Sequence, residues 1–483
     1  MDAQQSLSFE FGPWVPDIPQ LMNPAFPPQT DAYFKLGQVS LIEANNCIWT
    51  ANGYRSFSPL VGTPALPAKC IGAISCYDTT GAVQYFAGTS GHLYKLIAGV
   101  WSEVSIAGGY SASTNWSFQV FGNCLDATNG VDAMQTIDIT TGTNFAKLDT
   151  VGTDLVPIPK VLGVIRDFLV AGNTNDSTNG VVPYRVQWSA DSNDDQWPVP
   201  NTQNAFASQA GAQTLFSEYG PVQAISDNEF FGLIFQTTGI VRAEYVGGAN
   251  VFNFYTYEKK RGAIGPNAVV RVGNVYYFCS PDGFFMTDGS SVTPIGYEKV
   301  DRWFFSNANA SALSTVCAAA DTRNKLVYFA FQSGGSGLDS LLIYNYQEQS
   351  WTHAAQTADF IYSAVNASEW MPAGFTATHA HGFFTGTAGT STLTTQDFAL
   401  NPGGRALISM VRPLTDGTPS AAVGSRATLA SNPIWSAYTA LSTRSGVVGL
   451  RSEGLFHEVS VQNTASFINC VGASIWFAPM GAL

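Results

Sequence analysis

Two histidines near the end of the chain's middle region have the spacing of metal ligands. His379 and His381 alternate along a predicted strand, so their imidazoles could face the same side, as two ligands of one ion require. The chain has only five histidines, and no third His, Cys or carboxylate lies at a recognisable ligand spacing. The pair therefore favours a structural or solvent-facing role, and we predict no metal site and no cofactor.

The acidic segment from Ser189 to Trp197 is the second place where chemistry could occur. It approaches the Ser-x-Asp-x-Gly-x-x-Trp turn of propeller sialidases, but Asn193 replaces the glycine and the tryptophan comes one position late. That turn is structural even in those enzymes, so the segment favours a polar loop. We retain four of its residues as candidates for an assembly or gate loop: Asp191, Asp194, Asp195 and Trp197.

The usual catalytic motifs are missing from the sequence. There is no Gly-x-Ser-x-Gly elbow, no phosphate-binding P-loop, and no cysteine nucleophile with a suitable histidine context. Asp282-Gly283 and Asp288-Gly289 suit tight β-turns, in which glycine supplies a positive φ. We therefore predict that the chain is not an enzyme.

A short apolar run, a glycine turn and a second apolar run recur seven times along the chain. This pattern predicts pairs of antiparallel strands, and helical periodicity is found only from Tyr297 to Asn307. The copies span Val83 to Leu96, Phe118 to Ile139, Val161 to Trp188, Phe230 to Tyr245, Val275 to Thr287, Leu326 to Tyr344 and, more weakly, Trp370 to Thr385.

The glycines expected at these turns are spaced like the blades of a β-propeller. Successive spacings are 39, 42, 67, 44 and 52 residues, which bracket the blade period of about 40 to 50. The long step requires an insertion, and the polar stretch from Ser189 to Glu218 suits a surface loop rather than a strand. We predict an all-β fold with a β-propeller of about six blades. The turn glycines are Gly91, Gly130, Gly172, Gly239, Gly283 and Gly335.

Three regions are predicted along the chain. Residues 1–65 form an extended N-terminal segment leading into β-structure, residues 66–388 the propeller with an insertion near 189–218, and residues 389–483 a β-sandwich-like platform or docking domain. The N-terminal segment is a candidate to complete the last of these. Its prolines oppose a helix or a central strand; they are Pro13, Pro16, Pro19, Pro24, Pro27 and Pro28.

Composition favours assembly over electrostatic binding. Charged residues make up 12% of the chain, against about 25% in an ordinary domain, whereas aromatic residues reach 13%. Interface cores have this bias, so much of the surface is expected to face other subunits. The net charge of −13 opposes a clamp on nucleic acid, and the single basic run, Lys259 to Arg261, suits a solvated turn.

Cysteine usage and hydropathy bear on the cellular setting. The seven cysteines form no CxxC pair and lie mostly in or beside apolar segments, where a free cysteine packs as a small hydrophobe. We therefore expect a reduced, cytosolic site of assembly. No signal peptide and no apolar stretch of membrane-spanning length is recognised.

Eight segments form a recognisable series along the chain. They are Ala51 to Leu60, Ile165 to Gly172, Val186 to Ser189, Gly239 to Gly247, Arg261 to Val270, Pro281 to Gly289, Pro294 to Phe304 and Leu341 to Trp351. In this order they resemble the propeller-bearing tail nozzle proteins of short-tailed bacteriophages, the group that includes tail tubular protein B. The likeness runs from about residue 40 to the mid-380s, and more loosely through Arg405 to Arg412 and the end.

The resemblance implies a place in a virus particle. It implies a homo-oligomeric ring of six copies below the portal and adaptor, which encloses the exit channel of double-stranded DNA and docks fibres or spikes outside. It also implies a virion tail protein assembled in the host cytoplasm, with no catalytic residues. Seven residues look like structural positions of that family: Arg261, Gly262, Asp282, Gly283, Asp301, Arg302 and Trp303.

The sequence is compatible with two functional hypotheses. The first is a structural virion protein that lines the DNA ejection channel without binding DNA specifically. The alternative is a carbohydrate-binding or carbohydrate-cleaving propeller that recognises a host receptor, which the aromatic content and polar loops favour. Cleavage would need two carboxylates about 5 to 9.5 Å apart across a pocket, and the sequence identifies no such pair.

Overall fold

The computed structural model describes residues 5–18, 38–148, 154–226, 231–367, 369–401 and 403–480. Nearly all of its regular structure is β-strand, which confirms the predicted all-β class. The α-helices of these residues are α1 (Gln203–Ser208) and α2 (Asp301–Asn307), and the short 3₁₀ helices are η1 (Ser217–Tyr219), η2 (Gly248–Asn250) and η3 (Ala310–Thr315). Within the described ranges, no helix is long and apolar enough to cross a lipid bilayer.

Five separate four-stranded antiparallel sheets form the blades of a β-propeller, and each follows the chain order. Blade 1 is β6 (Gly72–Tyr77), β7 (Val83–Gly88), β8 (Leu93–Ile97) and β9 (Val100–Glu103); blade 2 is β10 (Ser117–Phe121), β11 (Cys124–Thr128), β12 (Gln135–Asp138) and β13 (Ala146–Lys147). Blade 3 is β14 (Ile158–Ile165), β15 (Phe168–Asp176), β16 (Gly180–Trp188) and β17 (Gly211–Thr214); blade 4 is β18 (Val222–Ile225), β19 (Phe231–Gln236), β20 (Ile240–Tyr245) and β21 (Phe252–Glu258). Blade 5 is β22 (Val269–Val272), β23 (Val275–Ser280), β24 (Gly283–Thr287) and β25 (Val292–Pro294).

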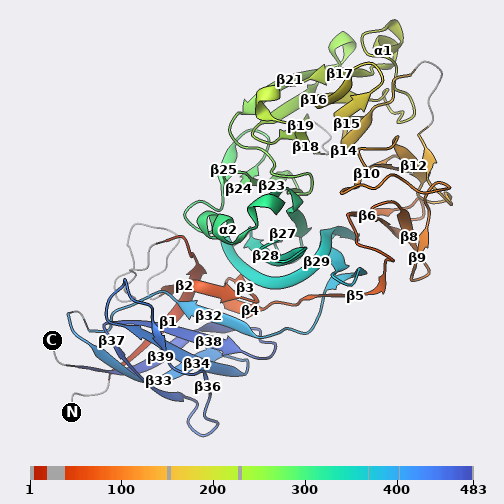
Figure 1. Ribbon diagram of the computed structural model, residues 1–483. Coiled ribbons are helices and arrows are strands. Elements are labelled where there is room, and N and C mark those ends of the chain that lie inside the picture. Colours follow the sequence, from red (N-terminus) through yellow and green to blue (C-terminus); the bar gives the residue numbers. More distant parts are fainter. Residues whose placement is uncertain are drawn as a thin grey trace.

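The blades follow one another around a circle (Figure 1). The first strands of successive blades are in contact from β6 to β10, β14 and β18. Blades 4 and 5 share a core that contains Phe235 on one side and Tyr276 and Phe278 on the other. Five of the predicted repeats coincide with strands of these blades, although Phe230, the first residue of one repeat, lies outside the described residues.

Strand glycines let neighbouring blades approach closely. A Cβ atom on Gly172 would lie 2.8 Å from a methyl group of Val222, and one on Gly232 would lie 2.1 Å from the end of Ile165. The prediction that Gly172 forms a turn is therefore wrong, because this residue lies inside β15. Its small size is needed for packing against the next blade.

The predicted insertion at 189–218 is more ordered than a surface loop. It contains α1 and also β17, which pairs with β16 from Arg185–Thr214 to Trp188–Gly211 and forms the outer strand of blade 3. The expectation that this stretch holds no strand was wrong. Its Asn, Gln and Ser content hid a short edge strand in which no residue is fully buried.

A larger sheet joins the two ends of the circle of blades. Its strands β26 to β29 form another antiparallel meander, and β26 contacts β22 of blade 5 while β29 contacts β6 of blade 1. The repeat from Leu326 to Tyr344 lies here, hydrogen-bonded into a larger assembly instead of forming a separate sheet. Its strands are β26 (Cys317–Asp321), β27 (Leu326–Phe331), β28 (Leu338–Asn345), β29 (Ser350–Asn366), β30 (Glu369–Thr376), β31 (Ala380–Phe384), β3 (Cys47–Thr50), β4 (Gly53–Ser56) and β5 (Leu60–Ala65).

The remaining strands form a second β-unit beside the propeller (Figure 1), which we call the C-terminal unit. Hydrogen bonding runs through it in the order β34–β38–β32–β2–β1–β39–β33–β37. The strands are β1 (Gln5–Trp14), β2 (Gln38–Asn45), β32 (Ser391–Thr395), β33 (Ala406–Thr415), β34 (Pro419–Arg426), β35 (Ile434–Trp435), β36 (Thr439–Ala440), β37 (Val448–Gly454), β38 (Phe456–Asn463) and β39 (Cys470–Pro479).

The N-terminal strand β1 is a central strand of this unit. It lies between β39 and β2, so the expectation that its prolines exclude such a position was wrong for the residues from Gln5 to Trp14. Pairing with β39 ends at Glu10, and the register with β2 shifts after Phe11, so Pro13 falls where the ladder is already irregular. Pro19, Pro24, Pro27 and Pro28 lie outside the described residues.

Candidate functional site

Helix α2 begins against the end of the N-terminal strand. Its own N-cap, Val300, provides no side-chain hydrogen bond. Asp17 takes that role instead, since the backbone N–H of Arg302 donates to Asp17 Oδ2 at 2.7 Å and that of Trp303 donates to Oδ1 at 2.8 Å. The first N–H groups of a helix have no partner within it, and they carry partial positive charge that a carboxylate neutralises. Asp17 therefore fastens the chain after β1 to the propeller side of the molecule.

Aromatic rings from distant parts of the sequence pack around this contact. The Trp14 ring meets Trp303 edge-on at 5.1 Å, and Phe284 lies 4.9 Å from Phe304 and 5.0 Å from Trp351 between ring centres. These rings belong to the largest hydrophobic core, which extends through the C-terminal unit. We call the following residues the junction cluster: Trp14, Asp17, Phe284, Asp301, Arg302, Trp303, Phe304 and Trp351.

Asp301 is one of two buried acids of the junction cluster, beside Asp17. Its Oδ1 accepts a hydrogen bond from the backbone N–H of Phe284 at 3.1 Å, and the carboxyl group fills the space that the missing side chain of Gly283 leaves. Burial raises the pKa of Asp301 to about 7, and the nearby carboxylates of Asp17 and Asp282 act in the same direction. Asp301 therefore changes charge near neutral pH at the centre of a packed junction.

The remaining family-like positions lie on blade 5 and the segment that leads to it. Arg261 Nε is 3.6 Å from Asp282 Oδ2, and the guanidinium lies 4.8 Å from the centre of the Phe285 ring. Arg261 is thus partly packed, and the solvated turn predicted for the basic run does not describe it. A Cβ atom on Gly262 would lie 1.9 Å from the backbone oxygen of Gln236, so only glycine fits against blade 4.

The acidic loop lies between blades 2 and 3. Trp197 is fully buried there, and its indole Nε1 donates to the backbone oxygen of Asp194 at 2.6 Å while its N–H donates to Asp154 Oδ2 at 2.8 Å. Asp191 and Asp195 are exposed. Trp197 therefore anchors the loop in the blade interface and leaves these two carboxylates at the surface.

The two histidines do not share a metal site. His379 lies in the turn before β31 and places its Nδ1 2.5 Å from Asp359 Oδ2. His381 is buried in β31, its Nε2 lies 2.8 Å from the Tyr362 hydroxyl, and burial lowers its pKa to about 4. Within the described ranges no group of three or more His, Cys, Asp or Glu residues could hold a metal ion.

The seven cysteines are free, and all but Cys124 are buried. Burial raises the pKa of Cys76 and of Cys317 to about 12. A thiol with so high a pKa is a poor nucleophile and packs as a small apolar group, as the sequence predicted.

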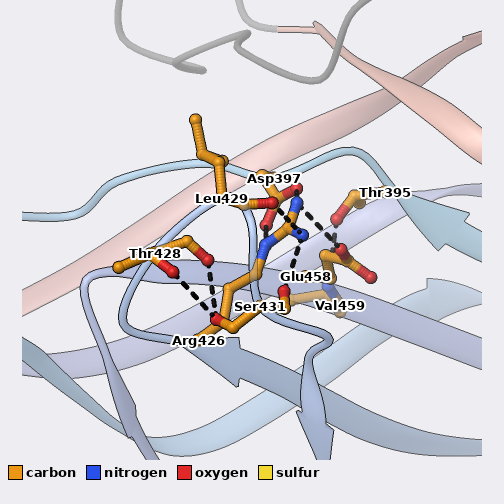
Figure 2. A network of polar contacts seen from close by, with 8 residues as sticks. All are labelled: Thr395, Asp397, Arg426, Thr428, Leu429, Ser431, Glu458 and Val459. Carbon is orange, nitrogen blue, oxygen red and sulfur yellow. Dashed lines mark hydrogen bonds and ion pairs between the residues drawn. The ribbon is translucent and has the colours of Figure 1, made fainter.

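A buried ionic network lies inside the C-terminal unit (Figure 2). Arg426 on β34 forms an ion pair with Asp397, and its Nη2 is 3.9 Å from Glu458 Oε1 on β38. Arg426 Nη1 also donates to the backbone oxygens of Leu429 and Ser431 at 3.0 Å. The sequence contained no signal for this network, because its members are isolated charges in unrelated segments.

Comparisons with known proteins show a limited likeness. No protein-family profile and no curated protein sequence matches the chain. Among solved structures, the computationally designed Ika8 protein has 9% sequence identity and a TM-score of 0.38, and the match covers 67% of this chain and 98% of that one. BamB from Moraxella catarrhalis has 10% identity and a TM-score of 0.38, with 71% of this chain and 98% of that one covered. We draw no functional conclusion from either.

Proposed function

We propose that this chain is a structural virion protein of a short-tailed bacteriophage, forming part of the tail nozzle through which the genome leaves. One observation carries the proposal. Three of the segments that resemble nozzle proteins meet in the junction cluster, because the ring of Phe284 lies 4.9 Å from that of Phe304 in the next segment and 5.0 Å from that of Trp351 in a later one. Because the three segments contribute to one packed cluster, a protein with this fold would need all of them.

The proposal includes a six-bladed propeller and a sandwich-like docking unit. The meander β26 to β29 would take the sixth position, because it lies between blade 5 and blade 1. The C-terminal unit would act as the β-sandwich platform that binds neighbouring tail proteins. The N-terminal strand supports a stable platform, since β1 pairs with β39 inside this unit and Asp17 binds the start of α2.

Contact between copies of the chain, as in the proposed homo-hexamer, fits the distribution of exposed apolar side chains. Ile434 is 78% exposed, Trp435 41% and Tyr438 43%, all on the segment that carries β35 and leads to β36. We call these three residues the apolar arm. Clustered exposed rings and aliphatic chains are typical of protein–protein contacts. The arm would contact a second copy of the chain, while the adaptor ring and the fibres or spikes would bind elsewhere on the platform.

Passage of DNA would depend on channel width and charge, with no catalytic step. The net charge of −13 would repel a duplex that passes through the ring and so limit adhesion. The acidic loop favours docking over gating, because Trp197 anchors it in the core between blades 2 and 3. Asp191 and Asp195 remain available at the surface for a partner.

Labelling of purified virus particles tests this location. Antibodies against the C-terminal unit should decorate the tail tip and not the capsid, and the chain should be recovered from tails by mass spectrometry. Absence from particles would contradict the proposal.

A surface groove favours the alternative, carbohydrate binding. It has a volume of about 510 Å³ and lies along the outer strands β17 and β21 of blades 3 and 4. Phe206, which is 52% exposed, and Phe254 offer ring faces for a sugar, and Asn253 and Gln213 offer amides for its hydroxyl groups. Saturable binding of host surface polysaccharide that Phe206→Ala abolishes would support this function, whereas absence of binding would exclude this groove.

A further inference from the structure

A cleft at the junction of the larger sheet presents two arginines. It has a volume of about 310 Å³, at the lower end for ligand sites, and lies among β3, β4, β27, β30 and β31. We call it the arginine cleft. Its lining includes Arg55 from β4 and Arg323 from the turn between β26 and β27. These residues are far apart in the sequence and meet only in the folded chain.

Neither arginine is neutralised within the described part of the chain. No ion pair joins Arg55 or Arg323 to a carboxylate there, whereas Arg185 pairs with Asp176 and Arg426 pairs with Asp397. In a chain with 35 acidic and 22 basic residues, two uncompensated guanidinium groups in one cleft are unexpected. With two guanidinium groups and the carboxylate of Asp321 in its lining, the cleft carries a net charge of +1 on an acidic protein.

The one acid in the cleft is already engaged. Asp321 Oδ1 accepts a hydrogen bond from the backbone N–H of Asn324 at 2.9 Å, and Oδ2 accepts one from the Asn324 side chain at 2.7 Å. These bonds hold the turn that carries Arg323. Asp321 is buried, with 5% of its surface exposed, and so has a local structural role.

The rest of the cleft wall is mainly apolar. The Tyr328 and Phe384 ring centres are 5.2 Å apart, and Phe57 lies 6.0 Å from Phe384. Met371 and Pro372 complete this side. These walls can bury an apolar side chain away from water.

We propose that the arginine cleft binds an acidic peptide segment of a partner protein, in which an Asp or Glu is next to an apolar residue. The carboxylate would lie between Arg55 and Arg323, because a guanidinium offers paired N–H donors that match a carboxylate. The neighbouring apolar side chain would pack against Phe384 and Met371. This inference does not depend on the proposed place in a phage tail.

Selection from a random phage-displayed peptide library tests the specificity directly. The full-length wild-type protein should enrich peptides with an acidic residue beside an apolar one, and the double variant Arg55→Gln/Arg323→Gln should not. Binding of an enriched peptide should weaken at least tenfold in each single variant. Arg444→Gln is the matched control, since Arg444 is exposed and outside the cleft, and it should change binding less than twofold.

Other results would overturn the proposal. Enrichment without acidic residues, or binding that survives loss of both arginines, would exclude a carboxylate held by this cleft. Saturable binding of glucuronate but of no acidic peptide would assign the cleft to an acidic sugar and not to a protein segment. Should the glutamine variants fail to fold, Arg55→Lys/Arg323→Lys keeps both charges without the paired donors and should still weaken the enriched peptide at least threefold.

Discussion

Asp17 and Arg302 are 285 positions apart in the sequence, yet the Asp17 carboxylate accepts the backbone N–H of Arg302 at 2.7 Å. The Arg302 side chain returns a hydrogen bond to the backbone oxygen of Asp17. Because Asp17 follows β1, which pairs with β39, this contact ties the C-terminal unit to the helix beside blade 5. This short stretch of the N-terminal segment therefore contributes to holding the two units together, beside the pairing of β2 with β29 and of β39 with β4.

Replacing Asp17 with Ala should loosen this junction. Two helix N–H groups would lose their partner, and loss of a capping side chain costs about 0.5–2 kcal/mol. Urea unfolding should show a lower free energy of unfolding, and a protease should cleave the chain faster near the end of β1. Asp191→Ala removes an exposed carboxylate and should stay within about 0.5 kcal/mol of wild type. Equal effects of the two changes would refute the capping role.

Asp301 should make stability depend on pH. Its folded pKa of about 7 lies above the ordinary value of 3.8, so the folded state holds the proton more tightly than the unfolded chain. This contribution is fully present below pH 3.8 and is lost as pH rises through about 7, with a slope of at most about 1.4 kcal/mol per pH unit. The difference in unfolding free energy between wild type and Asp301→Asn should fall between pH 4 and 7. Parallel pH curves would show that Asp301 does not titrate in this way.

Gly382 should be intolerant of any side chain. A Cβ atom there would lie 1.9 Å from the backbone oxygen of Val61 on the paired strand β5. Gly382→Ala must therefore push β31 away from β5, and a loss of several kcal/mol or failure to fold is expected. Gly389→Ala is the control, because no atom lies within 4 Å of its added Cβ. Thermal unfolding distinguishes the two, and a stable Gly382→Ala protein would contradict the close approach.

Breaking the buried network at Arg426 should destabilise the C-terminal unit. Arg426→Met leaves Asp397 and Glu458 buried without their cation, which costs about 3–5 kcal/mol in comparable cases. Arg405→Met removes a half-exposed pair with Glu453 and should cost at most about 1 kcal/mol. Denaturant unfolding monitored by hydrogen exchange in β34 and β38 measures both. A similar loss of unfolding free energy in the two variants would show that the buried Arg426 network contributes no more to stability than the half-exposed pair.

Repeated local signals made the propeller strands predictable from the sequence. The runs around Gly91, Gly239 and Gly283 combine apolar alternation with a turn residue, and each falls on two strands of a blade. Gly172 was wrongly predicted to form a turn, because a glycine needed for close packing looks the same in the sequence as a turn glycine. β17 was missed because an exposed edge strand lacks apolar alternation.

The functional contacts were harder to foresee than the strands. The family-like residues Asp301, Arg302 and Trp303 were identified, but their partner Asp17 is separated from them by nearly the whole propeller. Arg55 in β4 and Arg323 in the turn after β26 are likewise single charges in separate segments. No local pattern encodes such contacts, since they arise only when distant segments pack together.

Electron cryomicroscopy of the assembled tail tests the central claim most directly. The account predicts a closed ring of six copies of this chain around a lumen wider than duplex DNA, with the apolar arm at the contact between copies. A density map in which the chain is a monomer attached to the capsid surface, or forms an open array without a lumen, would contradict it.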